Sequence, residues 1–218
     1  MPSSIDSPSA QPADRPGAVA RSATASGRPP PPQASVLPLS NRLGRALWRV
    51  VHALLFRPTP TFAHGWRRTL LRLFGATIAP TAHVYPSARV WAPWNLTLGQ
   101  HACLGSWVDV YSVAPITIGD RTTISQYAHL CAATHDYTRP NYPLVTKAIT
   151  IGADCWIAAD VFVGPGVTIG EGTVVGARSS VFADLPAWVV AVGSPARAIK
   201  PRTLEGDPPS RVPRSASP

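Results

Sequence analysis

A six-residue repeat runs through residues 78–181 of this 218-residue chain and restricts the fold more than any other feature. The clearest stretch places six aliphatic residues in strict register, and glycine follows four of them. These six are Ile151, Ile157, Val163, Ile169, Val175 and Val181. Neither the period of an α-helix nor the two-residue period of an ordinary strand explains the pattern. A hexapeptide β-helix does, because each repeat supplies a short strand and a turn, and three repeats complete a triangular coil. We therefore predict an all-β, parallel β-helix.

The register of the repeat shifts twice before this stretch. It begins with Ile78, Val84, Val90 and Leu96, continues with Leu98, Leu104 and Val110, and then with Ile118, Ile124 and Leu130. We expect the aliphatic side chains to point into the prism and the glycines to allow the backbone conformations of the corners. The longest interruption separates Leu130 from Ile151, and we expect a protruding functional loop there. The left hand assigned to the helix follows from the known behaviour of such repeats, not from the spacing.

The segments outside the repeat divide the rest of the chain. Residues 1–39 and 206–218 are rich in proline, serine and arginine, and we expect both tails to be disordered because they bury too little surface to offset the entropy of ordering. Between them we assign an N-terminal helical segment to residues 40–75, the β-helix domain to 76–192 and a C-terminal extension to 193–205. The N-terminus lacks the apolar core of a secretory signal, which favours a cytoplasmic protein.

Two amphipathic helices are predicted in the N-terminal segment. The first covers Ser40–Phe56 and carries one apolar face, formed by Leu43, Leu47, Val50, Val51, Leu54 and Leu55. The second covers Ala63–Phe74, and we expect its three arginines, Arg67, Arg68 and Arg72, to lie outside. Neither helix has the ~20 apolar residues that a membrane span needs. The apolar faces either pack on the domain or on a neighbouring subunit, or they dock with the flanking arginines at the inner face of the membrane.

The net charge of +9 is compatible with an anionic ligand or an anionic membrane surface. No motif combines basic and aromatic residues in the manner of a nucleic-acid-binding module, so nucleic acid is not an expected partner. The three cysteines, Cys103, Cys131 and Cys155, form no CxxC pair, and we expect no metal.

Five segments of the chain resemble the hexapeptide-repeat O-acetyltransferases, and most closely the colanic acid biosynthesis acetyltransferases. They read GWRRTLLRLFGA, YPSARVWAPWNLTLG, APITIGDRTTISQYAHLCAATHDY, YPLVTKAITIGADCWIAADVFVGPGVTIGEGTVVGARSSVF and GSPARAIKPR. The resemblance implies a homotrimer in which acetyl-CoA lies in a groove between two adjacent β-helices. It also implies that one histidine of an extended loop acts as general base on the acceptor. The implied acceptor is a hydroxyl of a sugar or glycan intermediate, in exopolysaccharide or cell-surface glycan biosynthesis.

His135, within CAATHDY, matches the position of this histidine and lies in the predicted loop. A neutral imidazole can take the proton of a hydroxyl as its oxygen attacks a thioester carbonyl, and the ordinary pKa of histidine suits that task near neutrality. We expect backbone N–H groups to stabilise the oxyanion. A backbone carbonyl or Asp109 could orient the ring, whereas His129 is interpreted as structural.

The resemblance also implies which residues contact acetyl-CoA. They combine small residues of the last coils, an aromatic wall and three cations for the coenzyme phosphates. The assigned residues are Trp156, Ala159, Gly176, Ala177, Arg178, Arg197 and Lys200. A lysine that many relatives carry is replaced here by Ala183, and we expect Arg178 or Arg197 to compensate. The C-terminal extension is expected to pack near this groove.

Three residues are assigned to the acceptor: Asp109, Trp107 and Tyr111, of which the aromatic two offer stacking faces to a sugar ring. An asparagine that reads galactoside in the galactoside acetyltransferases aligns near Gly105 of this chain. Galactoside itself is therefore not the expected acceptor.

Two other functions are compatible with a β-helix. A γ-class carbonic anhydrase holds zinc with three histidines, and its close pair is separated by four residues. His129 and His135 are separated by five, and no third histidine sits at a matching place. The other alternative is a non-catalytic scaffold, which would not need His135.

Overall fold

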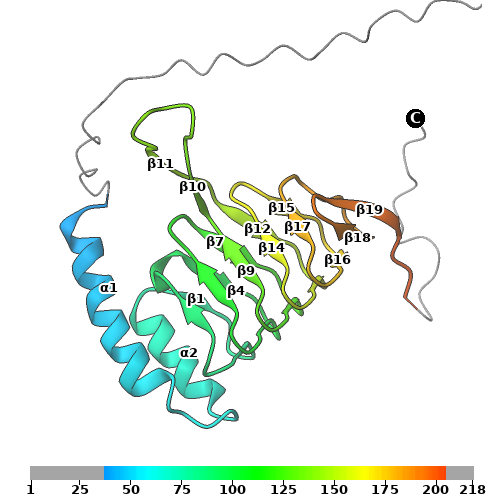
Figure 1. Ribbon diagram of the computed structural model, residues 1–218. Coiled ribbons are helices and arrows are strands. Elements are labelled where there is room, and N and C mark those ends of the chain that lie inside the picture. Colours follow the sequence, from blue (N-terminus) through cyan, green and yellow to red (C-terminus); the bar gives the residue numbers. More distant parts are fainter. Residues whose placement is uncertain (1–36, 205–218) are drawn as a thin grey trace, which may run out of the picture. The chain divides into compact units, whose positions relative to one another are not determined.

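The computed structural model describes residues 37–204, in which two helices precede a three-sided β-helix (Figure 1). The prediction of a left-handed parallel β-helix is confirmed, because short strands stack coil upon coil in three sheets that are parallel except for the last strand of one sheet. Residues 1–36 and 205–218 lie outside the described part of the chain, and with them almost all of the two predicted disordered tails.

Each coil contributes one strand to each of three sheets. Sheet A contains β1 (Thr77–Ile78), β4 (Leu96–Leu98), β7 (Ile116–Ile118), β12 (Ile149–Ile151) and β15 (Thr168–Ile169). Sheet B contains β2 (His83–Val84), β5 (Cys103–Leu104), β8 (Thr123–Ile124), β13 (Trp156–Ile157), β16 (Val174–Val175), β18 (Val189–Gly193) and β19 (Ala196–Pro201). Sheet C contains β3 (Arg89–Val90), β6 (Asp109–Tyr111), β9 (His129–Cys131), β14 (Phe162–Val163) and β17 (Ser180–Val181). In each coil the chain turns three times. We call the turn from sheet A to sheet B corner AB, the turn from sheet B to sheet C corner BC, and the turn from sheet C to sheet A of the next coil corner CA.

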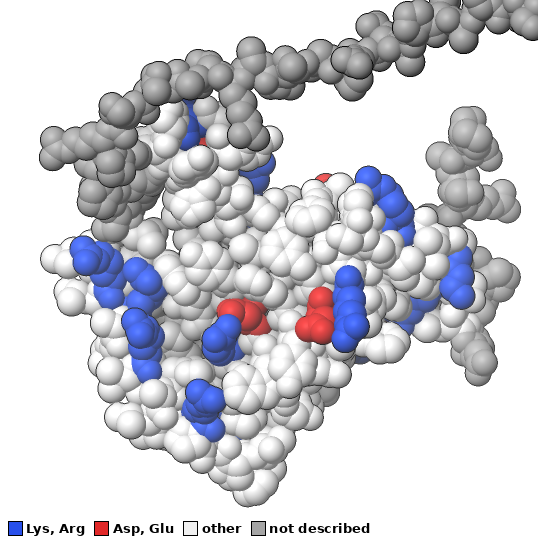
Figure 2. Space-filling model, in the orientation of Figure 1, with Lys and Arg blue, Asp and Glu red and all other residues white. Residues whose placement is uncertain are grey.

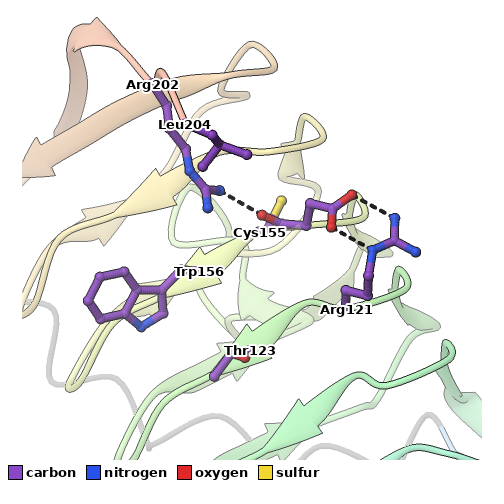
Figure 3. A pocket seen from close by; sticks show the side chains of 7 residues that line it. Arg121, Thr123, Cys155, Trp156, Arg202 and Leu204 are labelled. Carbon is purple, nitrogen blue, oxygen red and sulfur yellow. Dashed lines mark hydrogen bonds and ion pairs between the residues drawn. The ribbon is translucent and has the colours of Figure 1, made fainter. Parts of the chain in front are cut away.

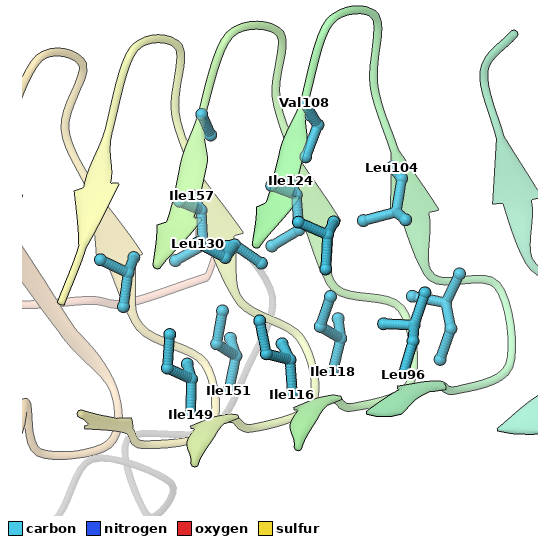
Figure 4. Close-up of a cluster of buried hydrophobic side chains, with 14 of the residues drawn as sticks. Leu96, Leu104, Val108, Ile116, Ile118, Ile124, Leu130, Ile149, Ile151 and Ile157 are labelled. Atoms are coloured by element: carbon cyan, nitrogen blue, oxygen red, sulfur yellow. The ribbon is translucent and has the colours of Figure 1, made fainter. Parts of the chain in front are cut away.

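One aliphatic column per sheet fills the interior of the prism (Figure 4). The six residues that define the clearest stretch of the repeat are each at most 1% exposed, which confirms their inward orientation. In sheet A, Leu98, Ile118, Ile151 and Ile169 occupy the same register in successive coils. Burial of a side chain of this size stabilises a fold by about 1.5–3 kcal/mol, so the stacked columns form the core.

The repeat glycines serve a purpose other than the expected one. None of them has a positive φ, so the prediction that they relax the corner backbone was wrong. They lie where successive coils approach closely. A Cβ atom on Gly119 would come within 2.5 Å of the Ala153 nitrogen, and one on Gly152 within 2.6 Å of the Glu171 nitrogen. Glycine is needed at these positions because the next coil leaves no room for a side chain.

At most corners, a residue other than glycine adopts the left-handed backbone conformation. At corner BC, Trp107, Tyr127, Asp160 and Arg178 have φ between 60 and 62°. This conformation is unfavourable for bulky residues. Here the amide of each donates to an oxygen of the preceding coil, as from Arg178 N to Ala159 O (2.9 Å). The stacked coils therefore stabilise the turn, and the corner side chains are left exposed to solvent.

Helix α1 (Leu39–Val51) continues as a π-helical turn, η1 (His52–Phe56), and packs on the β-helix through aromatic residues. Trp48 and Phe56 are buried with their rings 5.7 Å apart, and Trp48 Nε1 donates to Val90 O (2.7 Å). With His52 they form an aromatic stripe at four-residue spacing. Large aromatic rings bury more apolar area in this contact than the aliphatic side chains of the same helix would.

Most of the predicted apolar face of this helix lies on the opposite side and does not pack on the domain, and only its member Val51 is partly buried against the core. Its exposed members are Leu43, Leu47, Val50, Leu54 and Leu55. For these five residues the interpretation of packing on their own domain is therefore wrong, because the aromatic stripe occupies that contact. A neighbouring subunit and a bilayer are the interpretations that are left.

Helix α2 (His64–Leu73) contains a buried arginine that was expected outside. Arg67 is 0% exposed, and its guanidinium donates to the carbonyl oxygens of Val84 (2.6 Å), Pro60 (2.9 Å) and Thr61 (2.5 Å). Burial lowers the pKa of this guanidinium, which still remains charged. The expectation failed because the charge is satisfied by oxygen acceptors of the backbone rather than by water.

The two helices supply hydrogen-bond donors to the first coil, which has no coil before it. In the second coil, the carbonyls of Leu98, Ala102, Leu104, Val108 and Val110 accept amide hydrogens of the first coil. The equivalent carbonyls of the first coil accept from side chains: Ile78 from Arg72, Ala82 from Arg68, Val84 from Arg67, Ala88 from His52 and Val90 from Trp48. An open sheet edge leaves polar groups unsatisfied and invites further pairing. These donors therefore close the N-terminal end of the β-helix.

Replacing Arg67 by methionine should destabilise the fold, because the length of the side chain is kept while its donors are lost. The charged donors to the carbonyls of Val84, Pro60 and Thr61 would be lost, and we expect a loss of about 3 kcal/mol or more in the free energy of unfolding. The measurement is the urea midpoint of unfolding. The matched control is Arg42→Met on the exposed side of α1, which should stay within about 0.5 kcal/mol. Equal midpoints for the two variants would contradict the capping role.

Candidate active site

The longest interruption of the repeat forms an antiparallel hairpin that leaves the prism at corner CA (Figure 1). Its strands are β10 (Ala133–His135) and β11 (Leu144–Thr146). At the base, Lys147 N donates to Ala132 O (3.1 Å), and at the far end Asp136 N donates to Pro143 O (2.9 Å). The expected loop is therefore an ordered hairpin, and His135 is the last residue of its first strand.

The imidazole of His135 is exposed and has a defined orientation. Its Nδ1 lies 2.6 Å from the carbonyl oxygen of Tyr142 across the hairpin loop. A carbonyl can only accept, so Nδ1 carries the hydrogen, and in the neutral ring Nε2 keeps its lone pair. Of the two groups expected to orient the His135 ring, a backbone carbonyl or Asp109, the structure shows the carbonyl. Asp109 is engaged elsewhere, in an ion pair with Arg89 (2.5 Å) on sheet C.

The loop that carries Tyr142 is held by the carboxylate of Asp136. Oδ1 of Asp136 accepts from the hydroxyl (2.5 Å) and the amide (3.0 Å) of Thr138, and Oδ2 lies 3.3 Å from Nε of Arg139. The hydrogen bond from the Thr138 hydroxyl is the main reason why the pKa of Asp136 is lowered. Tyr142 N in turn donates to Arg139 O (3.0 Å), so the turn returns the Tyr142 carbonyl to His135.

Five of the residues assigned to the coenzyme lie together at or beside corner BC. Ala159, Gly176, Ala177 and Arg178 belong to stacked turns of two successive coils. Trp156 stands on the adjacent strand of sheet B, half exposed, and its Nε1 donates to Ser125 Oγ (2.9 Å). Together these five residues make a wall of small residues and backbone beside one aromatic face. We call this surface the BC wall.

Two of the assigned cations lie on the edge strand of sheet B. Arg197 is opposite Val192 and Lys200 is opposite Val190 in the antiparallel pair β18–β19. A Cβ atom on Gly176 would meet Cγ1 of Val192, so Arg197 lies one strand beyond the BC wall. Arg178 is in the BC wall itself, where its Nε is 3.6 Å from Asp160.

The rest of the C-terminal extension leads away from that wall. Arg202 crosses to corner AB, where Nη1 donates to the carbonyls of Asp154 (2.7 Å) and Gly172 (2.8 Å). There it borders a hollow of about 450 Å³ (Figure 3). Arg121 lies on the opposite side of the hollow and binds the Asp154 carboxylate through two contacts of 2.7 Å each. No sequence pattern singles out Arg202, since contacts to backbone carbonyls leave no signal in the sequence.

The three residues assigned to the acceptor do not meet in one pocket. Trp107 is at corner BC, where it lines a hollow of about 450 Å³ together with Tyr85 and Tyr127. Asp109 and Tyr111 lie on the outer face of sheet C. There the ring of Tyr111 continues an aromatic column, formed by Trp91, Tyr111, His129, Phe162 and Phe182.

Within one chain, His135 and the BC wall occupy different corners of the prism. The chain passes corner BC, then a strand of sheet C, and only then corner CA with its hairpin. Sheet C therefore separates the imidazole from the BC wall. Ala183, at the position of the missing lysine, follows β17 and lies on the corner CA side as well. Among residues 37–204, no three His, Cys, Asp or Glu side chains are placed to hold a metal ion.

Comparison with known proteins identifies relatives over most of the chain. The family described as bacterial transferase hexapeptide (six repeats) matches residues 148–183. The Escherichia coli K12 protein named "Putative colanic acid biosynthesis acetyltransferase WcaF" is 48% identical over 162 residues, covering 74% of this chain and 89% of that protein. Among solved structures, galactoside acetyltransferase in complex with coenzyme A aligns with a TM-score of 0.69 and 28% identity, covering 78% and 86% of the two chains. An acetyltransferase of Vibrio cholerae complexed with acetyl-coenzyme A gives 0.65 and 28%, covering 75% and 88%.

Replacing Asp136 by alanine should loosen the loop that orients His135. The amides of residues 137–143 should exchange with deuterium faster, while those of the core strands are unchanged and serve as the internal control. Acid should loosen the same loop in the unaltered protein. Because the folded-state pKa of Asp136 is lowered, its carboxylate stabilises the loop fully above about pH 4, and this stabilisation is lost as the pH falls through the folded-state pKa. Equal loop protection in the alanine variant would show that the carboxylate does not order the loop.

Proposed function

This chain belongs to the hexapeptide-repeat acetyltransferases, and we propose that it transfers an acetyl group from acetyl-CoA to a hydroxyl of a sugar or glycan intermediate. The observation that carries the proposal is the His135 imidazole, presented on a hairpin with Nδ1 bound to the Tyr142 carbonyl. This arrangement leaves Nε2 as a base directed away from its own loop. The acetyl donor is supported by the two relatives whose structures hold coenzyme A and acetyl-coenzyme A.

The proposed reaction is a direct transfer with His135 as general base. Nε2 removes the hydroxyl proton as the acceptor oxygen attacks the thioester carbonyl, and a tetrahedral oxyanion forms. Collapse of this intermediate breaks the C–S bond, and the imidazolium returns the proton to the departing thiolate. The Tyr142 carbonyl stabilises the imidazolium by accepting from Nδ1 throughout. No covalent bond to the protein is required, and backbone N–H groups would stabilise the oxyanion.

The positions of His135 and the BC wall support a homotrimer with shared sites. Sheet C separates the two within one chain, so His135 does not face the BC wall of its own chain. In a threefold assembly around parallel axes, corner CA of one chain can face corner BC of the next. Each groove would then combine His135 of one chain with Trp156 and Arg178 of its neighbour. Arg178, Arg197 and Lys200 are the cations proposed to bind the coenzyme phosphates.

The class of acceptor rests on the names of the relatives. One is named for colanic acid biosynthesis and the other for the acetylation of galactoside. An exopolysaccharide or cell-surface glycan intermediate fits the first of these, which is the more similar relative by identity. Trp107, Asp109 and Tyr111 stay the proposed acceptor residues, although within one chain they do not line a common pocket. The cytoplasm is the proposed compartment.

Replacing His135 by asparagine should lower kcat by at least ~100-fold, which is the usual contribution of a general base. The matched control is His101→Asn. His101 is an exposed corner residue with φ 56°, a conformation that asparagine tolerates. We expect the control to retain wild-type acetyl transfer, measured as thiol released from acetyl-CoA in the presence of sugars. Near-wild-type turnover of a folded His135→Asn protein would remove His135 from its proposed role.

Mixed trimers test the shared site with the same assay. One variant carries His135→Asn, and the other carries Ala177→Trp, which blocks the BC wall. Each alone should be inactive. After random reassembly of equal amounts, about one quarter of the grooves combine an intact His135 with an intact wall, so about a quarter of the activity should return. No recovery would place the complete site within one chain.

Replacing Arg197 by alanine should raise the KM for acetyl-CoA at least about tenfold and leave the KM for the acceptor nearly unchanged. A charge-assisted contact to phosphate contributes ~1.5–3 kcal/mol, which corresponds to that change. The control is Arg42→Ala, because α1 lies at the opposite end of the β-helix from β19 (Figure 1). An unaltered KM in the Arg197 variant would leave the phosphates to Arg178, Lys200 or backbone amides.

A further inference from the structure

The outer face of α1 and η1 carries an apolar stripe that no described part of the chain covers. Leu39, Leu43, Leu47, Val50 and Leu54 recur at spacings of three and four residues, so they line one side of the helix. Each is between 55% and 67% exposed, although the aromatic residues on the other side of the same helix are buried. We call these five residues the leucine stripe. Soluble surfaces rarely expose a continuous aliphatic row of this kind without a binding partner.

An arginine-lined groove runs along one flank of the leucine stripe. It has a volume of about 720 Å³ and lies between α1 and the β3 region. Its lining includes Arg45, Arg49, Arg57 and Arg89, and Val50 of the stripe forms part of its rim. Arg42 lies on the same flank by helical spacing. Figure 2 shows the blue side chains gathered over α1, at the left of the view, with no red among them.

The charge of this region is of one sign only. Residues 37–108 contain eight arginines and neither aspartate nor glutamate. Arg67, Arg68 and Arg72 are used to cap the first coil. The others lie beside the stripe, and within residues 37–204 Arg89 is the one among them that forms an ion pair, with Asp109.

We propose that the leucine stripe and its flanking arginines form a docking surface for an anionic lipid bilayer. The aliphatic residues would insert among the headgroups, and Arg42, Arg49 and Arg57 would bind the lipid phosphates. An amphipathic helix with aliphatic residues on one face and arginines at its flank binds in this way. Trp66 lies next to the C-terminal end of the stripe, with Nε1 donating to Leu55 O (2.8 Å), and half-exposed tryptophan is frequent at membrane interfaces.

The charge pattern favours a bilayer over a second copy of the chain. A twofold contact would place arginines of one helix against the same arginines of the other, which is unfavourable. The acidic residues within 37–204 all lie after residue 108, and Asp109, Asp136, Asp154 and Asp160 are in ion pairs. No helix within the described residues is both long and apolar enough to cross a bilayer, so the contact would be peripheral. The inference does not rest on the proposed acetyl transfer.

The test is flotation of the full-length protein with vesicles. Vesicles of equal parts phosphatidylglycerol and phosphatidylcholine should bind the protein at least ~10-fold more tightly than pure phosphatidylcholine, and high salt should weaken the binding. The variant Leu43→Ser/Leu47→Ser should lose most of this binding, and Arg42→Gln/Arg49→Gln should reduce the preference for the anionic lipid. The matched control is Ile199→Ser, which removes a similarly exposed aliphatic residue from β19.

Light scattering of the same variants decides whether the leucine stripe binds a bilayer or a second copy of the chain. All of them should keep the mass of the unaltered assembly, because the stripe contacts lipid and not protein. Absence of binding to anionic vesicles would overturn the proposal, as would equal binding by the Leu43→Ser/Leu47→Ser variant. A fall in mass of that variant, without vesicle binding by the unaltered protein, would identify the stripe as a subunit interface.

Discussion

Hydrogen bonding from coil to coil is the constraint on which the rest of this structure depends. Each strand is only two or three residues long in most of the β-helix, so no strand is stable alone and every one relies on the coil above and below. This stacking fixes the separation of the coils at the spacing of neighbouring strands, about 4.8 Å. The repeat glycines follow from that spacing, since a Cβ on Gly119 or Gly152 would enter the next coil.

The same constraint explains the composition of the N-terminal helices. A stacked coil whose neighbour is missing presents carbonyls without donors, and in this protein these carbonyls accept from Trp48, His52, Arg67, Arg68 and Arg72. The helices therefore do more than cover an apolar surface. They replace one coil of hydrogen bonds, and this requires long side chains with donors at their ends. The aromatic stripe holds α1 in place for this purpose, which leaves the aliphatic stripe on the outside.

The corners and the hairpin carry the groups available for chemistry. Inward positions are filled by the aliphatic columns, so the polar and aromatic residues lie on the outer faces and the corners. The hairpin at corner CA holds His135 on an ordered strand, and a carbonyl of its own loop orients the imidazole. Because the prism has three sides, groups on different corners of one chain are kept apart by a rigid sheet. A groove that uses both corners needs another chain, and this is the physical basis of the trimer proposed above.

The sequence alone determined the β-helix, the inward residues and the break that carries His135, because a period of six with buried aliphatic residues has few other solutions. It could not show that Arg67 is buried, since the pattern of an amphipathic helix does not record which backbone carbonyls lie opposite. Nor could it show which side of α1 packs: the regular leucines and the aromatic stripe of Trp48, His52 and Phe56 are both consistent with a helix, and only the fit against β3 selects the second. The orientation of His135 by Tyr142 also depends on the closed loop, where two residues seven positions apart meet at 2.6 Å. These features belong to the tertiary structure because each of them is a contact between different segments. No local sequence pattern states which segments come together in space.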